Sequence, residues 1–258
     1  MTSHRSNVTF VLVPGSFSTP IFYDKVTPIL TSQGYTFKEA PLLSAAKASS
    51  GRQPPATMQE DAAQIHSVIE SVLDEGNDVV VAVHSYGGFP GTEALKGLGR
   101  AGRPPSKGTA VIGIVYIVSF LPPVGSSLRD LMHDYQSEPF KSGLPGQYFL
   151  FDGRMGPAVF NDLTDEAEIR RYVAAMIDHS SDSFGGKLSY AAYKDIPSTF
   201  ILPENDLVVP TSFQHEMVEL AVRDGGRVKK IAVPGAGHAV NVSRPELVAE
   251  ALVDAARG

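Results

Sequence analysis

The 258-residue sequence contains no cysteine and no tryptophan. Without cysteine, the chain cannot form disulfides, thiolate-ligated metal sites or iron–sulfur clusters, and it cannot use a cysteine nucleophile. Long hydrophobic runs are missing as well. The first apolar stretch, Val8–Val13, is far shorter than the ~20 residues that span a bilayer. These absences disfavour a disulfide-stapled or membrane-spanning protein.

A block of basic residues is also missing. The chain has 22 Lys and Arg against 28 Asp and Glu, which gives a net charge of −6. A mildly acidic chain of this kind is a poor partner for nucleic acid or for an anionic membrane surface. Hydrophobic residues make up 43% of the sequence, enough for the core of one large domain. We therefore expect a soluble, cytoplasmic monomer or homodimer whose partner is a small-molecule substrate.

Short β-rich runs alternate with amphipathic stretches along most of the chain. Strands are expected at 8–13, 35–41, 78–83, 109–121, 198–202 and 227–233, and helices at 23–32, 57–73, 87–98, 211–223 and 244–256, the last with Ser243 as N-cap. This alternation predicts the α/β class, with a mostly parallel, doubly wound sheet. Residues 123–195 interrupt the alternation once, and we call them the cap segment. The expected organisation is a single domain, with a core of 1–122 and 196–258 and the cap segment inserted between them.

Ser85 lies between a buried strand and a helix that begins at Gly87-Gly88. This setting is typical of a nucleophile elbow, where a sharp turn raises the serine hydroxyl above the carboxyl end of the strand, at a helix N-terminus. Residues two before and two after the serine should be small. Gly87 meets this requirement and Val83 does not. The alternative interpretation is a serine that only caps the helix.

Two later loops carry a candidate acid and a candidate base. Asp206 follows the strand at 198–202, and His238 lies in a glycine-rich loop directly after the last strand. The chain order Ser, Asp, His is that of α/β hydrolases. Either residue alone could be structural, the aspartate as a turn former and the histidine as a packing residue. Glu204 is a rival acid, but it lies closer to the strand.

The turn after the first strand is a candidate for half of an oxyanion hole. Pro14 has no N–H, so the donor there would be Ser16 or Phe17, while Tyr86 would supply the second N–H. An ordinary β-turn is the alternative. We expect Phe17, Tyr86 and Phe120 to line the substrate pocket. Together with the many aromatics of the cap segment, they favour a medium-sized apolar or aromatic ester.

Taken together, these motifs resemble the α/β-hydrolase superfamily, and within it the compact group of plant methylesterases, hydroxynitrile lyases and microbial serine hydrolases. The stretches that carry the resemblance are Val13–Ser16, His84–Gly88, Ser119–Pro122, Phe160–Leu163, Asp206 with Pro210, and Gly237-His238. Pro14 replaces the customary histidine and Val83 the customary glycine. The resemblance implies cleavage of a carboxylic ester or lactone by a Ser85–His238–Asp206 triad through an acyl-enzyme, without a metal or organic cofactor.

Other reactions use the same triad, so the alternatives are a C–C bond hydrolase, a lyase and a cyclising acyl transferase. Hydroxynitrile lyases typically carry a lysine after the catalytic histidine and a threonine in the first strand. Here Ala239 and Val11 stand at those places, which disfavours that lyase. A non-catalytic ligand receptor is the alternative from another class, and the complete triad argues against it.

Overall fold

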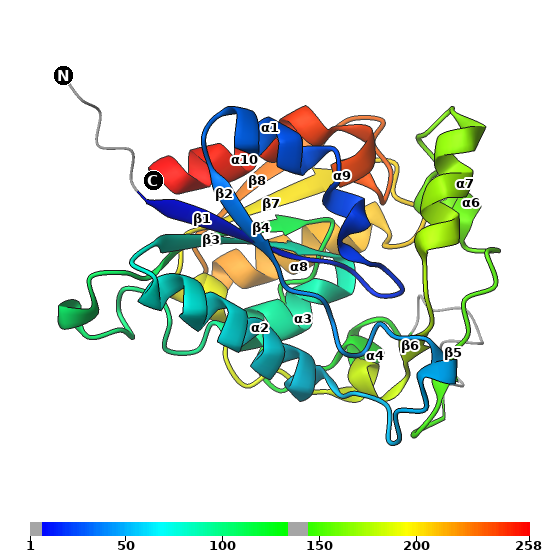
Figure 1. The fold of residues 1–258 in the computed structure, drawn as a ribbon, viewed down its shortest axis with the longest axis horizontal. Coiled ribbons are helices and arrows are strands. Elements are labelled where there is room, and N and C mark those ends of the chain that lie inside the picture. The colour runs from blue at the N-terminus through cyan, green and yellow to red at the C-terminus, as the bar shows by residue number, and fades with distance from the viewer. Residues whose placement is uncertain (1–6, 134–143) are drawn as a thin grey trace.

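The computed structural model describes residues 7–133 and 144–258. Its centre is a sheet in the order β2-β1-β3-β4-β7-β8, in which every neighbouring pair is parallel (Figure 1). The strands are β1 (Val8–Val13), β2 (Thr36–Glu39), β3 (Asp78–His84), β4 (Val111–Ile117), β7 (Ser198–Pro203) and β8 (Val228–Val233). The predicted fold class is therefore confirmed.

Helices cover both faces of the sheet (Figure 1). One face is covered by α1 (Val26–Ser32), α9 (Val240–Ser243) and α10 (Pro245–Arg257), and the other by α2 (Met58–Asp74), α3 (Gly88–Ala94) and α8 (Thr211–Arg223). The apolar side chains of the strands alternate between the two sides. In β3, for example, Val81 and Val83 belong to one buried cluster, while Val80 and Ala82 belong to the other. This alternation explains why the central strands are apolar throughout.

Two predicted elements end four residues earlier than expected. The strand predicted to reach residue 121 ends at Ile117, because Val118 has a φ of 48° and the chain turns there toward the start of α3. The helix predicted to reach residue 98 ends at Ala94. Beyond it, Leu95 and Leu98 donate to carbonyls three residues back, and Gly97 adopts a φ of 79°.

The predicted N-cap of the last helix is wrong. Ser243 is the final residue of α9, and α10 begins at Pro245 with Arg244 in the capping position and no side-chain cap. A proline in the first turn has no N–H to satisfy, so the helix start needs fewer capping partners.

The cap segment lies beyond the carboxyl ends of the strands (Figure 1). Its elements are α4 (Leu128–Leu131), β5 (Tyr148–Phe149), α6 (Gly156–Val159), α7 (Glu166–Ala175) and β6 (His179–Ser180), with β5 and β6 paired antiparallel. The assignment of core and cap segment to one domain stays a prediction.

The cap segment is hydrogen-bonded to two loops of the core. The N–H of Ala239 donates to the Val159 carbonyl at 3.1 Å, and Asn161 Nδ2 donates to the Asn205 carbonyl at 2.8 Å. A Cβ added at Gly237 would lie 2.1 Å from Asn161 Oδ1, so the loop can approach the cap segment this closely only with glycine at that position.

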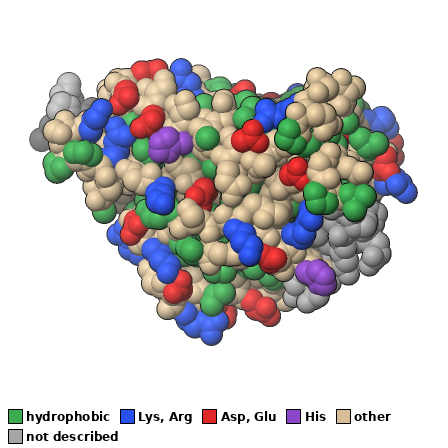
Figure 2. All heavy atoms as spheres, turned by 90° about the horizontal axis from the view of Figure 1, so that it is seen from below, with side chains coloured by type: hydrophobic (Ala, Val, Ile, Leu, Met, Phe, Trp, Pro, Cys, Tyr) green, Lys and Arg blue, Asp and Glu red, His purple; other side chains and the backbone are tan. Residues whose placement is uncertain are grey.

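Charged side chains of both signs are mixed across the face seen in Figure 2. Several charged side chains form ion pairs, for example Lys194 with Asp224 at 2.5 Å. Within residues 7–133 and 144–258, no helix is long and apolar enough to cross a membrane.

Candidate active site

Ser85 stands at the turn between β3 and α3. Its φ is 50°, in the left-handed region that residues other than glycine rarely adopt, so the backbone is strained at this point. The hydroxyl of Ser119 donates to the Ser85 carbonyl at 2.7 Å and helps to hold the turn. A short 3₁₀ turn, Ser85–Gly87, then leads into α3. The local geometry is that of a nucleophile elbow.

Neighbouring loops approach this turn so closely that glycines are required. A Cβ at Gly87 would lie 2.4 Å from the Pro14 carbonyl oxygen, and a Cβ at Gly15 would lie 2.9 Å from Ser85 Cβ. The turn after β1 is therefore packed directly against the elbow. This contact brings the two predicted halves of the oxyanion hole together.

The structure brings the three predicted triad residues together. His238 Nε2 lies 3.1 Å from Ser85 Oγ, and His238 Nδ1 lies 3.1 Å from Asp206 Oδ2 and 3.2 Å from Oδ1. All three residues are buried. The rival acid, Glu204, is exposed. The series Ser85–His238–Asp206 is continuous and has the geometry of a general-base relay.

Asp206 accepts hydrogen bonds from three donors in addition to His238. Its Oδ1 accepts from the N–H groups of Val208 and Val209, and its Oδ2 accepts from Gln214 Nε2 at 2.9 Å. Burial acts to raise the pKa of Asp206, but the charge of His238, its hydrogen bond and the two backbone donors together hold that pKa below its usual value. The carboxylate therefore stays ionised beside the imidazole.

Gln214 is a site residue that the sequence reasoning missed. It lies buried in the first turn of α8, where Nε2 also donates to the Val209 carbonyl at 2.8 Å. Its place in the first turn of the helix after the acid loop could have identified it, because side chains there can point back toward that loop.

His84, directly before the nucleophile, supports the base loop. Its Nε2–H donates to the His238 carbonyl at 3.0 Å. Burial, followed by the neighbouring charge of His238, lowers the pKa of His84 to about 3. The ring is therefore neutral and acts as a fixed donor beneath the elbow.

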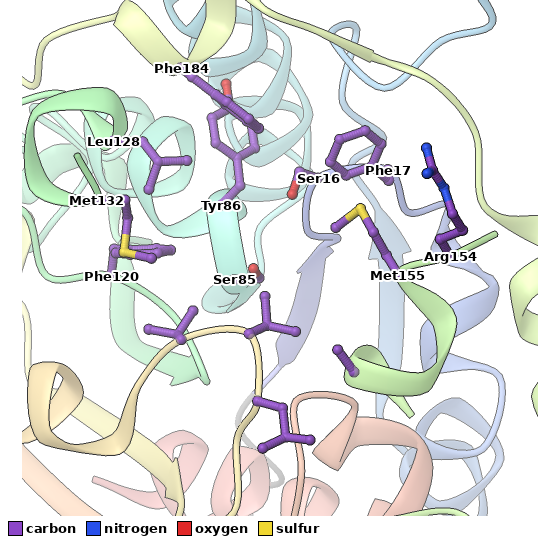
Figure 3. A pocket seen from close by; sticks show the side chains of 14 residues that line it. Ser16, Phe17, Ser85, Tyr86, Phe120, Leu128, Met132, Arg154, Met155 and Phe184 are labelled. Carbon is purple, nitrogen blue, oxygen red and sulfur yellow. The ribbon is translucent and has the colours of Figure 1, made fainter. Parts of the chain in front are cut away.

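The candidate oxyanion donors lie around Ser85, and the side chains of Ser16, Phe17 and Tyr86 face the same cavity (Figure 3). Tyr86 is the second residue of the 3₁₀ turn Ser85–Gly87, and the first N–H groups of a helical turn have no intrahelical acceptor. The Phe17 N–H donates to Nδ1 of His179 in the cap segment, with an N···N distance of 3.4 Å. Because that N–H is already used, Ser16 is the stronger candidate for the first donor.

A cavity of about 380 Å³ opens onto Ser85 (Figure 3). The three predicted pocket residues, Phe17, Tyr86 and Phe120, all line it. Most of the remaining lining was not predicted: it consists of Leu128, Met132, Arg154, Met155, Ala158 and Phe184 from the cap segment and Leu207, Val208 and Val209 from the acid loop. The lining is mostly apolar and suits a medium-sized hydrophobic ligand.

Among the described residues that line this cavity, Arg154 carries a charge, and it forms an exposed ion pair with Asp152. In the part of the chain that the structure describes, no group of three or more His, Asp and Glu side chains could hold a metal ion.

Comparison with known proteins agrees with the fold. The family model of the alpha/beta hydrolase family matches residues 10–251, and the chain belongs to this family. It is 32% identical to the probable hydrolase R7 of Phoma sp. over 95% of this chain and 97% of that protein. It is 29% identical to the alpha/beta hydrolase nvfD of Aspergillus novofumigatus over 95% of each chain.

Among solved structures, polyneuridine aldehyde esterase superposes with a TM-score of 0.75 at 22% identity, over 96% of this chain and 99% of that chain. At this identity, the likeness shows the fold. It agrees with the resemblance to plant methylesterases noted in the sequence.

Proposed function

We propose that this protein is a serine hydrolase that cleaves a carboxylic ester or lactone of a medium-sized apolar or aromatic small molecule. The observation that carries the proposal is the unbroken series from Asp206 through His238 to Ser85 Oγ, because Ser85 lines a mostly apolar cavity. The name of the similar protein R7, a probable hydrolase, and that of polyneuridine aldehyde esterase point to the same class of reaction.

In the proposed mechanism, His238 Nε2 takes the proton of Ser85 as Oγ attacks the substrate carbonyl. Asp206 orients the imidazole and stabilises the imidazolium that forms. The N–H groups of Ser16 and Tyr86 bind the developing oxyanion, where each donor is worth about 3 kcal/mol. His238 then gives its proton to the leaving alcohol, and the acyl group stays on Ser85.

Deacylation repeats these steps with water as the nucleophile. His238 takes a proton from the water, the tetrahedral intermediate collapses, and Ser85 leaves as a hydroxyl after recovering the proton. Side chains and backbone groups of this chain supply each proton transfer and each charge contact, so the proposed reaction uses no cofactor. The apolar lining favours substrates whose acyl or alcohol part is hydrophobic.

The test combines active-site labelling with a substrate screen. A fluorophosphonate probe should label the wild type and fail to label Ser85→Ala. Wild-type protein should hydrolyse aryl esters or lactones, with kcat lowered by about 10⁴-fold or more in Ser85→Ala. Ser126→Ala is the matched control, since the Ser126 hydroxyl donates to the Pro123 carbonyl away from the triad; it should label and react as the wild type does.

The outcome also separates the alternatives. Turnover of β-diketones without turnover of esters would replace the ester proposal by C–C bond hydrolysis with the same triad. A folded wild type that resists the probe and hydrolyses no activated ester would overturn the hydrolase proposal and leave a ligand receptor.

A further inference from the structure

The turn that follows β1 is bonded to the cap segment on both sides of one residue. The Phe17 carbonyl accepts from the Ile177 N–H at 3.0 Å, and the Phe17 N–H donates to His179 Nδ1 at an N···N distance of 3.4 Å. Ile177 lies just before β6, and His179 is its first residue. Residues 177–179 of the cap segment thus bind both backbone polar groups of Phe17, the residue next to Ser16.

Phe17 needs such support because its backbone is strained. Its φ is 59°, in the left-handed region, which costs roughly 1–2 kcal/mol for a residue with a Cβ. The Phe17 N–H belongs to the peptide plane between Ser16 and Phe17. The Ser16 N–H belongs to the preceding peptide plane. Once the plane between Ser16 and Phe17 is fixed, only the backbone torsions φ and ψ of Ser16 still set the direction of the Ser16 N–H. The contact with His179 therefore constrains the direction of the candidate oxyanion donor.

The tautomer of His179 is set by its other ring nitrogen. Nε2–H donates to Ser183 Oγ at 3.0 Å, and the Ser183 hydroxyl donates onward to the Ser180 carbonyl at 2.9 Å. Nδ1 is left as the acceptor for the Phe17 N–H. Burial lowers the pKa of His179 to about 3, so the ring stays neutral and able to accept.

His179 also contacts the second candidate donor residue. Its ring meets the ring of Tyr86 edge to face, with centroids 4.9 Å apart and planes at 77°. The far end of Tyr86 is fixed as well, because its hydroxyl donates to the buried carboxylate of Asp61 at 2.9 Å. One cap-segment side chain thus contacts Tyr86 and also Phe17, the residue next to Ser16.

We propose that His179 is a positioning residue of the oxyanion hole, which acts through the Phe17 peptide to direct the Ser16 N–H at the reacting carbonyl. The inference rests on the proposed function and goes beyond it, because it gives the cap segment a part in transition-state stabilisation as well as in substrate binding. The interaction matters where negative charge develops, so it should affect kcat more than KM.

Two substitutions separate the hydrogen bond from the packing. His179→Phe keeps a buried aromatic ring against Tyr86 but removes the acceptor. His179→Asn retains an acceptor in place of Nδ1. On an aryl ester, His179→Phe should lower kcat about 10- to 100-fold with KM changed less than about 3-fold, while His179→Asn should stay within about 5-fold of the wild-type kcat. His66→Phe, on α2 and bonded to the Ala94 carbonyl, is the control and should leave kcat unchanged.

A transition-state analogue supplies a second readout. An arylboronic acid whose oxygen occupies the hole should bind His179→Phe more weakly by the same factor as the loss in kcat, while a ground-state competitive inhibitor should bind as before. If His179→Phe does not fold, Ser183→Ala serves instead, because it removes the partner that fixes the His179 tautomer; a smaller loss in kcat is expected.

Crystal structures of the variants decide the inference independently of activity. In His179→Phe, the peptide between Ser16 and Phe17 should rotate and Phe17 should leave the left-handed region. An unchanged peptide, an unchanged kcat, or equal losses in His179→Phe and His179→Asn would overturn the inference while the proposed function stands. A wild type that fails the labelling test would instead overturn the proposed function, and the peptide geometry would still show whether His179 holds the turn.

Discussion

Val83 of β3 packs into the space left by Gly91 of α3: a Cβ added at Gly91 would lie 2.4 Å from Val83 Cγ1. The elbow motif calls for a small residue two positions before the nucleophile, because the helix that follows packs back against the strand there. In this chain, the helix supplies the small residue and the strand keeps a valine. The departure at Val83 is thus compensated within the elbow itself.

Gly91→Ala should therefore destabilise the protein. The new methyl group would overlap Val83 in a packed core, which costs about 1–3 kcal/mol, although alanine is intrinsically the better helix former. Urea denaturation measures the loss. Because α3 begins at the elbow, the displaced helix should also lower kcat.

The matching test is Gly91→Ala in a Val83→Ala background. With the valine shortened, the clash disappears and the helix propensity of alanine remains, so Gly91→Ala should there be neutral or stabilising by up to about 1 kcal/mol. If Gly91→Ala lowers the free energy of unfolding equally in both backgrounds, the side chains at 83 and 91 do not compete for the same space.

Gln214→Leu should loosen the hold on Asp206, the acid of the proposed triad. The substitution keeps an apolar chain of similar size but removes the donor to Asp206 Oδ2 and to the Val209 carbonyl. We expect kcat/KM to fall about 10-fold, as for other residues that orient a catalytic group, and the free energy of unfolding to fall by about 1–3 kcal/mol. Steady-state kinetics and urea denaturation measure the two effects.

Gln59→Leu is the control for this substitution. Gln59 is exposed on α2, and its amide makes a single 3.4 Å hydrogen bond to the Lys187 carbonyl. Its replacement by leucine should change neither kcat/KM nor the free energy of unfolding by a measurable amount. Wild-type kinetics in Gln214→Leu would mean that the backbone donors alone fix Asp206.

Asp61→Asn should change how stability depends on pH. The Asp61 carboxyl is fully buried beneath Tyr86, and burial raises its pKa from 3.8 to about 6 despite the hydrogen bonds from Ser44 and Tyr86. Since the folded pKa lies above the unfolded one, the folded state holds this proton more tightly. The contribution of Asp61 protonation to the free energy of unfolding is fully present below about pH 4 and is lost as the pH rises through about 6.

The measurement is the difference in unfolding free energy between wild type and Asp61→Asn across this pH range. The wild type should lose on the order of 3 kcal/mol relative to the variant between pH 4 and pH 7. Glu75→Gln, at an exposed carboxyl after the same helix, should show no comparable trend. A difference that is flat with pH for Asp61→Asn would mean that Asp61 titrates alike in the folded and unfolded chain.

The features that could be predicted from the sequence are the ones written into contiguous residues. The apolar run of β3 specifies a strand buried on both faces, and the glycines that follow Ser85 permit the sharp turn. Asp206 and His238 each follow a strand, and parallel strands bring their carboxyl ends to one edge of a sheet. Local patterns and one topological rule therefore suffice to predict that the three candidate triad residues lie close together.

The features that escaped prediction depend on contacts between distant segments. The lining contributed by Leu128, Met155 and Phe184 depends on how the cap segment folds back over the sheet, and nothing in the local sequence specifies that path. The contact of His179 with Phe17 joins residues 162 positions apart. Ser243 failed as an N-cap for a local reason, since the short helix α9 ends at that residue.

The hydrogen bonds from Val159 and Asn161 reach the two loops that carry His238 and Asp206. The cap segment that lines the cavity and the loops that carry the candidate base and acid are thus hydrogen-bonded to each other. A chimaera that takes residues 123–195 from a relative would inherit foreign partners for its acid and base loops. To exchange substrate preference without losing turnover, the crossover points should lie so that both loops travel with the transplanted piece.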